Sequence, residues 1–220
     1  MSPVFVIPAS QKLVSAIDTV RPIVDGDPSR TKPLYKDIGY AYVDDVVDGM
    51  VLDFIRESES TSARTRSLVE TLAKLIKSIA HGLVGQAFGK LTPDHARAVL
   101  AYLDDRASRF HDRPGLAAPI DEEAAHGIET ALASLESSDL DARRHVLKST
   151  MRRVIVRAME YHYQKPFALL DLGFLTRKAV DVGYDTISRG AVSTIESAIS
   201  EAEEQQLREL TQFLARRLRR

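Results

Sequence analysis

The chain has 220 residues and a mass of 24.4 kDa, which is long enough to bury a sizeable hydrophobic core. Its composition, 44% apolar and 28% charged residues, is that of a globular protein and excludes intrinsic disorder. The net charge of -1 excludes binding to nucleic acid or membrane through the charge of the chain as a whole, and the lack of cysteine excludes disulfides, iron-sulfur clusters and thiolate zinc sites.

Five of the nine prolines lie in the first 33 residues, which separates this segment from the rest of the chain. Because proline inside a helix removes a backbone donor and clashes with the preceding turn, residues 1–33 are predicted to form an irregular N-terminal arm. Within the arm we expect a short helix over residues 10–20 and, at residues 4–7, a segment that pairs only weakly as a strand. Residues 34–220 are predicted to form a single helical-bundle domain.

Apolar residues spaced by three and four predict helices in the proline-free parts of the chain. The first covers residues 37–55 and ends at a polar segment rich in serine, and the second covers residues 68–88. Thr92 followed by Pro93 is a helix start signal, since it places an N-cap before a proline in the first turn. The helix that begins there is expected to reach about Phe110.

The middle of the chain is predicted to be helical as well, apart from one loop. Residues 114–119, which include two prolines and a glycine, are expected to form that loop. Asp121 is the predicted N-cap of a short helix. Ser138 or Asp139 is the predicted N-cap of a long helix, which ends at Lys165-Pro166 because the residue before proline avoids the helical conformation.

The C-terminal residues carry the longest apolar stripe. One helix is expected from Phe167 to Gly190, and a final helix that reaches Leu218 would be on the order of 40 Å long. No run combines strand periodicity with hairpin turn residues. The chain is therefore predicted to be all-α: a bundle of about seven or eight helices, with an irregular proline-rich N-terminal arm and a long C-terminal helix.

Two aspartates of the first long helix, Asp44 and Asp48, lie one turn apart in the string Y-A-Y-V-D-D-V-V-D-G. Carboxylates at this spacing can jointly hold Mg²⁺, which in turn holds a diphosphate. The string resembles the first aspartate-rich motif of the all-helical isoprenoid synthases, in particular the phytoene and squalene synthase branch. The resemblance implies a Mg²⁺-dependent enzyme acting on a diphosphate, with Asp44 and Asp48 as metal ligands and Asp181 and Asp185 as the match to a second motif.

Histidines give a weaker indication of a metal site. His111 and Asp112, with His81 before them and His126 after them, resemble the ligand order of the metal-dependent HD-type phosphohydrolases. Glu123 and His126 form half of a di-iron carboxylate motif. Chance pairing among six histidines explains both patterns, so no metal is assigned on this ground.

Charge is distributed unevenly along the chain. Residues 37–59 hold seven acidic side chains and one basic, whereas residues 143–165 hold seven basic and one acidic. Arg144, Lys148 and Arg152 form one row opposite the apolar stripe of their helix, which would suit an acidic partner or nucleic acid. The alternative is that the two charged segments attract each other within the fold.

The chain has no serine nucleophile elbow, Walker loop or dinucleotide fingerprint. The leading hypothesis is therefore a non-catalytic interaction or assembly protein, a subunit, adaptor or regulator without a cofactor that acts through exposed helix faces. Its partner would be another protein or a second copy of the chain, with nucleic acid as a variant. The predicted contact residues are Arg144, Lys148, Arg152, Leu207, Leu210, Phe213 and Leu214. The alternative is the Mg²⁺-dependent enzyme.

The sequence also bears on location. No stretch is long and apolar enough to span a bilayer, and the first residues lack the basic region and apolar core of a signal peptide. The expected location is the cytoplasm.

Overall fold

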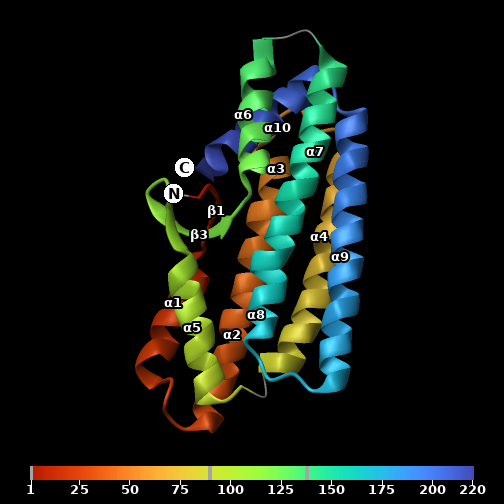
Figure 1. Ribbon diagram of the computed structural model, residues 1–220. Coiled ribbons are helices and arrows are strands. Elements are labelled where there is room, and N and C mark those ends of the chain that lie inside the picture. The colour runs from red at the N-terminus through yellow and green to blue at the C-terminus, as the bar shows by residue number, and fades with distance from the viewer. Residues whose placement is uncertain (1, 89–90, 137–138) are drawn as a thin grey trace.

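The computed structural model describes residues 2–88, 91–136 and 139–220 (Figure 1). The helices are α1 (Gln11–Val20), α2 (Pro28–Val47), α3 (Asp53–Glu57), α4 (Ala63–Ala87), α5 (Pro93–Arg106), α6 (Glu122–Ala133), α7 (Leu140–Met159), α8 (Lys165–Ala168), α9 (Phe174–Glu201) and α10 (Glu204–Arg217). Short 3-10 turns, η1 (Arg21–Ile23) and η4 (Ser134–Glu136), and two π-turns, η2 (Asp48–Leu52) and η5 (Glu160–Gln164), adjoin them. The strands are β1 (Val4–Pro8), β2 (Ala107–Phe110), β3 (Arg113–Pro119) and β4 (Leu218–Arg219). The chain is predominantly helical, which confirms the predicted all-α class.

Long helices lie side by side and enclose the core (Figure 1). α4 packs against both α2 and α9, and α7 packs against α9 and α6. The close approach of α9 depends on a glycine: a Cβ atom at Gly183 would overlap the hydroxyl of Tyr163 and press on Ile79 and Leu83 of α4. The apolar stripes found in the sequence are the faces that these helices turn towards one another.

Most predicted helix starts are confirmed by their caps. The side chains of Ser10, Thr92, Asp121 and Asp139 accept hydrogen bonds from backbone amides two or three residues into their helices. Each cap satisfies a backbone donor that has no partner within the helix. Ser138, the other predicted cap of α7, lies outside the described residues.

A four-stranded antiparallel sheet, ordered β2-β3-β1-β4, lies on one side of the bundle (Figure 1). The segment expected to pair weakly as a strand is β1, and the helix expected over residues 10–20 is α1. The arm is otherwise less irregular than predicted, since α2 begins at Pro28 and contains Pro33, and the loop expected at 114–119 belongs to strand β3. The prediction that α5 reaches Phe110 was also wrong, since the helix ends at Arg106 and the hairpin follows. These strands depend on pairing between distant segments, which proline-containing runs of five to seven residues do not reveal.

Pro166 does not end the long helix, contrary to the prediction. α7 continues through the π-turn η5 into α8, and the proline falls in the first turn of α8. A proline there removes a backbone donor that the wider π-turn leaves without its usual partner.

The long helix near the C-terminus is α9, with boundaries that differ from the prediction. It continues through Gly190 and ends at Glu201, so residues 191–218 are not one helix. Glu203 and Gln206 form a capping box that starts α10 in a new direction, across the upper end of the bundle against α6 and α7 (Figure 1).

Candidate functional site

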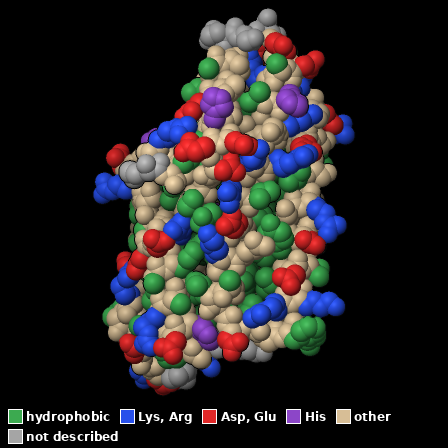
Figure 2. All heavy atoms as spheres, in the orientation of Figure 1, with side chains coloured by type: hydrophobic (Ala, Val, Ile, Leu, Met, Phe, Trp, Pro, Cys, Tyr) green, Lys and Arg blue, Asp and Glu red, His purple; other side chains and the backbone are tan. Residues whose placement is uncertain are grey.

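A cavity of about 120 Å³ lies in the middle of the helical bundle. Its walls come from α2, α4, α7 and α9, and α5, η5 and α8 close one end. An engineered apolar cavity of roughly 150 Å³ is large enough to bind benzene, so this cavity can hold a small organic group. Figure 2 shows apolar side chains gathered in the middle of one face, with charged side chains around them.

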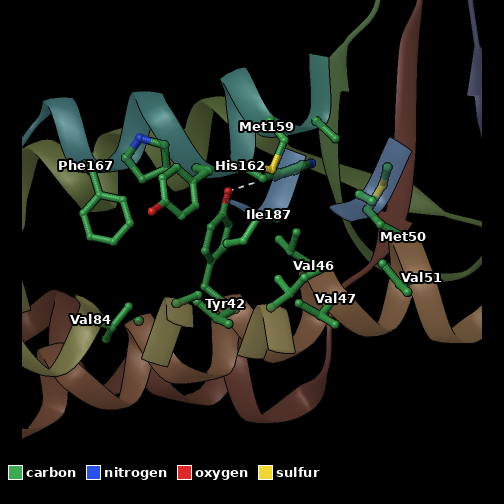
Figure 3. Close-up of a pocket in the computed structure, with 18 of the residues that line it drawn as sticks. Tyr42, Val46, Val47, Met50, Val51, Val84, Met159, His162, Phe167 and Ile187 are labelled. Atoms are coloured by element: carbon green, nitrogen blue, oxygen red, sulfur yellow. Dashed lines mark hydrogen bonds between the residues drawn. The ribbon is translucent and has the colours of Figure 1, made fainter. Parts of the chain in front are cut away.

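The lining is almost entirely apolar. Valine, leucine and isoleucine dominate, and the described lining residues include no carboxylate, lysine or arginine. Met50, Met151 and Met159 contribute flexible side chains from two sides (Figure 3). Methionine adapts to ligand shape because it is unbranched and polarisable. The cavity therefore suits an apolar group whose exact shape is not imposed by the wall.

Both π-turns contribute to the cavity. Met50 and Val51 come from η2, while His162 and Tyr163 come from η5. A π-turn adds one residue to the helical turn and so changes which side chains face inward, and such turns are frequent at functional sites. Figure 3 places Met50 and Val51 towards one end of the cavity and Phe167 towards the other.

The polar feature of the cavity is a pair formed by Tyr42 and His162. Tyr42 extends from α2 across the cavity, and its hydroxyl lies 2.8 Å from Nδ1 of His162 (Figure 3). The two residues are only 7% and 8% exposed. Burial raises the pKa of Tyr42 well above its usual value, and burial, with a smaller effect from Arg106, lowers the pKa of His162 to about 4. Both side chains are therefore neutral at pH 7.

One nitrogen of this pair is left without a hydrogen-bond partner by the described residues. Nε2 of His162 is buried and has no hydrogen-bond partner among the residues described. The other lining hydroxyls are satisfied: Tyr163 donates to the carbonyl oxygen of Val180 at 2.9 Å, and Tyr102 donates to that of Tyr161. Burial raises the pKa of Tyr102 to about 12, so it also remains neutral. The Tyr42–His162 pair is thus the part of the cavity wall that can bind a polar atom.

The two aspartates of the predicted metal site are paired with cations. Lys77 lies 3.3 Å from Asp44 and 2.8 Å from Asp48, and Nε2 of His81 lies 3.2 Å from Asp44. Burial opposes the charge of Lys77, but the hydrogen bonds and charges of Asp48 and Asp44 raise its pKa overall. Arg56 also contacts Asp48, at 3.4 Å. The carboxylates thus already hold positive charge from α4 and α3.

Within the described parts of the chain, no third metal ligand joins these aspartates. Asp181 and Asp185, the predicted second motif, are exposed on α9, and Asp185 pairs with Arg189. In the described ranges, no group of three or more histidine or acidic residues is arranged to hold a metal ion.

The histidines of the second metal pattern are not brought together as ligands. His81 contacts Asp44, whereas His111 sits in the turn between β2 and β3 with a positive φ of 53°. His126 is exposed on α6, where its Nε2 lies 3.4 Å from the hydroxyl of Thr130.

The basic row of α7 contacts the segment around the end of α9. Arg144 donates to the carbonyl oxygen of Ala202 at 2.9 Å and pairs with Asp141. Arg152 donates through Nε to Glu196 at 3.0 Å, and Lys148 is half-buried between them in the row. In the described pairs, the basic segment finds its acidic partners on α9 (Glu196), at the start of α6 (Asp121 and Glu123) and within α7 and η5 (Asp141 and Glu160), and these pairs do not involve the acidic segment 37–59.

The apolar residues predicted as partner contacts are buried within the chain. Leu207, Leu210, Phe213 and Leu214 are 0%, 7%, 3% and 1% exposed, and all belong to the hydrophobic core. α10 folds back onto the bundle instead of projecting from it, so these side chains pack against α6, α7 and β1.

The Tyr42–His162 pair was not among the predicted site residues, although the sequence contains a signal for it. His162 continues the stripe of Met151, Ile155 and Met159 on the inward face of α7. A histidine at that position faces the interior, and so needs a buried partner. Tyr42 occupies the corresponding inward position on α2, but which of several tyrosines would be the partner depends on how the helices pack.

None of the described helices is long and apolar enough to cross a membrane. No known protein family, curated protein or solved structure matches this chain.

Proposed function

We propose that this chain is a non-catalytic binding protein that holds a small apolar ligand in the cavity between α2, α4, α7 and α9. The observation that carries the proposal is an apolar cavity of about 120 Å³ with a buried, neutral Tyr42–His162 pair in its wall. Ligand sites in proteins are typically apolar enclosures with a few placed polar groups, and this cavity has that composition.

The cost of the empty cavity supports the same proposal. At about 24 cal/mol per Å³, a void of this size costs roughly 3 kcal/mol of stability. A ligand that fills the space restores the lost contacts and removes apolar surface from water. Binding would therefore stabilise the folded chain.

The test compares one substitution inside the cavity with the same substitution outside it. Val47 lines the cavity and is 3% exposed, whereas Val156 is on the outer side of α7 and is 45% exposed. Val47→Phe should occupy the cavity and weaken binding of a small apolar fluorescent reporter such as naphthalene by about tenfold or more, while Val156→Phe should leave binding unchanged. Equal affinity in both variants would contradict the proposal, as would a wild-type chain that binds no apolar compound.

A second proposal keeps the assembly role expected from the sequence, through α9 instead of α10. Phe174, Leu175 and Val182 are 80%, 79% and 59% exposed on α9. Two copies of this helix, antiparallel and crossing at Val182, would bring Lys178 of one copy near Asp185 of the other, which gives the face the self-complementary charge that a two-fold dimer requires.

Light scattering tests the second proposal independently of the cavity. The wild-type chain should have twice the mass of 24.4 kDa, and Leu175→Ser/Val182→Ser should return it to the monomer. The matched control Leu132→Ser, at a leucine of α6 that is 43% exposed, should leave the dimer intact. A wild-type monomer at high concentration would exclude this assembly.

A further inference from the structure

We infer that the ligand is a linear apolar chain bearing a neutral carbonyl oxygen, as in a fatty ester or ketone, and that this oxygen accepts a hydrogen bond from the Tyr42–His162 pair. This inference rests on the proposed function and adds the chemical class of the ligand to it.

The proton count of the pair gives the first step. A neutral histidine carries one N–H and tyrosine carries one O–H, so the pair has two donors, and the 2.8 Å contact between Tyr42 Oη and His162 Nδ1 uses one of them. If tyrosine donates, Nε2 of His162 carries the remaining proton. If Nδ1 donates, the remaining proton is on Tyr42. In either tautomer one donor is left over, and only an acceptor can bind it.

Burial makes this remaining donor matter. His162 is only 8% exposed and lines the cavity. Its Nε2 has no hydrogen-bond partner within the described parts of the chain. A buried polar group without a partner destabilises a protein far more than a satisfied one stabilises it. A ligand oxygen within reach of the Tyr42–His162 pair would accept a hydrogen bond from its remaining donor, whereas a pure hydrocarbon would leave that donor unpaired.

The lining also indicates that the acceptor is uncharged. A carboxylate in an apolar enclosure needs a cation beside it, because desolvation of the charge is otherwise too costly. Lysine and arginine are lacking among the described lining residues. Arg106, which affects the pKa of His162, is held by Asp105 and by the rings of Tyr102 and Tyr161, and is not part of the lining. An ester or ketone oxygen fits this environment better than an ionised acid.

The shape of the cavity indicates a linear tail. Lining residues continue along α2 and η2 from Tyr42 to Val51, a helical rise of roughly 13 Å. Figure 3 shows Val46, Val47, Met50 and Val51 following one another along this side, away from Phe167. An extended alkyl chain can lie along this wall with its carbonyl group at His162.

The experiment compares methyl octanoate, undecane and octanoate as competitors of a bound apolar fluorescent reporter. Methyl octanoate and undecane have the same number of heavy atoms, so they differ mainly in the oxygen acceptor. Because water solvates the ester better than the alkane, the quantity to compare is the ratio of ester affinity to undecane affinity. We expect this ratio to be about three- to tenfold higher for the wild-type chain than for a variant without the polar pair, which corresponds to one net hydrogen bond. We expect octanoate to bind more weakly than the ester at pH 7.

The matched variant is Tyr42→Phe/His162→Leu, which removes both partners and leaves no orphaned polar group. Replacing both partners with apolar groups of similar shape is close to neutral for folding. In this variant the ratio of ester affinity to undecane affinity should fall by that factor, while undecane should bind at least as well as in the wild type. In the wild type, ¹⁵N shifts of the His162 ring should also change with the ester and not with undecane.

Each result separates the two levels of the proposal. If none of the compounds displaces the reporter and none raises the melting temperature, the proposed function fails and the inference fails with it. If the ratio of ester affinity to undecane affinity is the same in the wild type and in the variant, the cavity is a binding site but the carbonyl contact does not exist. If octanoate binds as tightly as the ester, the requirement for a neutral head group is overturned.

Discussion

The C-terminal end of the molecule and the middle of its bundle deal with buried polarity in opposite ways. At the C-terminal end, Arg217 is fully buried, yet it contacts Glu57 at 3.1 Å and Asp53 at 3.4 Å and lies 3.5 Å from the ring centre of Phe213. In the middle, the buried polar pair borders a void. The first region surrounds its buried charge with carboxylates and an aromatic ring, whereas the second leaves a void beside its polar pair.

The charged cluster at the C-terminal end is held together by mutual compensation. Burial by itself would raise the pKa of Glu57, but hydrogen bonds from Arg217 and Arg216 lower it overall. Burial raises the pKa of Asp53, against the opposing effect of Arg217. Burial lowers the pKa of Arg217, against the same two carboxylates. Removing a carboxylate leaves the buried Arg217 with less compensation, and removing Arg217 leaves two partly exposed carboxylates without their cation.

The largest expected effect follows from this compensation. Arg217→Met should destabilise the fold by about 3–5 kcal/mol, since it leaves Asp53 and Glu57 without their buried cation. Urea denaturation measures the change. Arg216→Met, which removes a 46% exposed partner of the same Glu57, is the control and should cost at most about 1 kcal/mol. Similar losses in the two variants would show that burial of Arg217 is not what matters.

The C-terminal end and the middle of the bundle should also differ in how much stability they lose when a leucine is replaced by alanine. Leu207 in α10 is 0% exposed and lies in the packed region, whereas Leu72 in α4 faces the cavity. Both changes to alanine should lower the free energy of unfolding by about 2–5 kcal/mol. Leu207→Ala should lie near the top of this range and Leu72→Ala near the bottom, because the side chain of Leu72 already lacks neighbours on one side. Sedimentation of Leu207→Ala should show an unchanged oligomeric state. A reversed order of stabilities would mean that the cavity closes in solution.

The third effect depends on pH. The pKa of His162 is lowered from 6.5 to about 4 in the folded chain, so the unfolded chain takes up a proton first as the pH falls. Stability should therefore fall by about 2 kcal/mol between pH 7 and pH 5 on account of this group, and the loss should level off below pH 4. Tyr42→Phe/His162→Leu should lack this part of the pH dependence. Parallel stability curves for the two proteins would contradict the burial of His162.

Adding one methylene group should have opposite signs in the two regions. Val47→Leu extends into the cavity and should stabilise the chain by about 0.5–1 kcal/mol. Val6→Leu enlarges a 0% exposed residue of β1, against which a Cβ atom at Gly115 would already be in tight contact, and should cost about 1–3 kcal/mol. Thermal unfolding of both variants checks the prediction. Two losses of equal size would indicate that the cavity has no room.

The smallest effect concerns the aspartates of the predicted metal site. Since Lys77, His81 and Arg56 already contact Asp44 and Asp48, Mg²⁺ with pyrophosphate should leave the melting temperature unchanged. Asp44→Ala should respond in the same way as the wild type. A rise in melting temperature that is lost in Asp44→Ala would instead support the Mg²⁺-dependent enzyme.

Local signals predicted the helices well. The apolar spacing identified α2, α4, α5, α6 and α7, and the caps at Thr92 and Asp121 fixed two of their starts. These features depend on neighbours within a few residues, which a sequence displays directly. The break between α9 and α10 was missed because Gly190 is a stronger local signal than the capping box at Glu203, although packing of Gly190 near Leu72 keeps the helix continuous.

Features that depend on distant residues could not be predicted in the same way. β1 is a strand because it pairs with β3, more than one hundred residues away, and with β4, more than two hundred residues away. The Tyr42–His162 contact joins positions 120 residues apart. The leucines of α10 appeared free to bind a partner only because the turn that folds α10 onto the bundle was not foreseen.

The pairing of β1 with β4 has a consequence for the order of folding. Val4 and Phe5 lie opposite Arg219 and Leu218 (Figure 1). The second edge of β1 is therefore covered only when residues more than two hundred positions later have been synthesised. During synthesis the helices can form as they emerge, but the sheet stays incomplete until translation of this segment ends. Closing so long a loop is entropically costly and slow compared with forming helices. Until residues 218–219 have been synthesised, the edge of β1 that β4 covers thus remains open to aggregation.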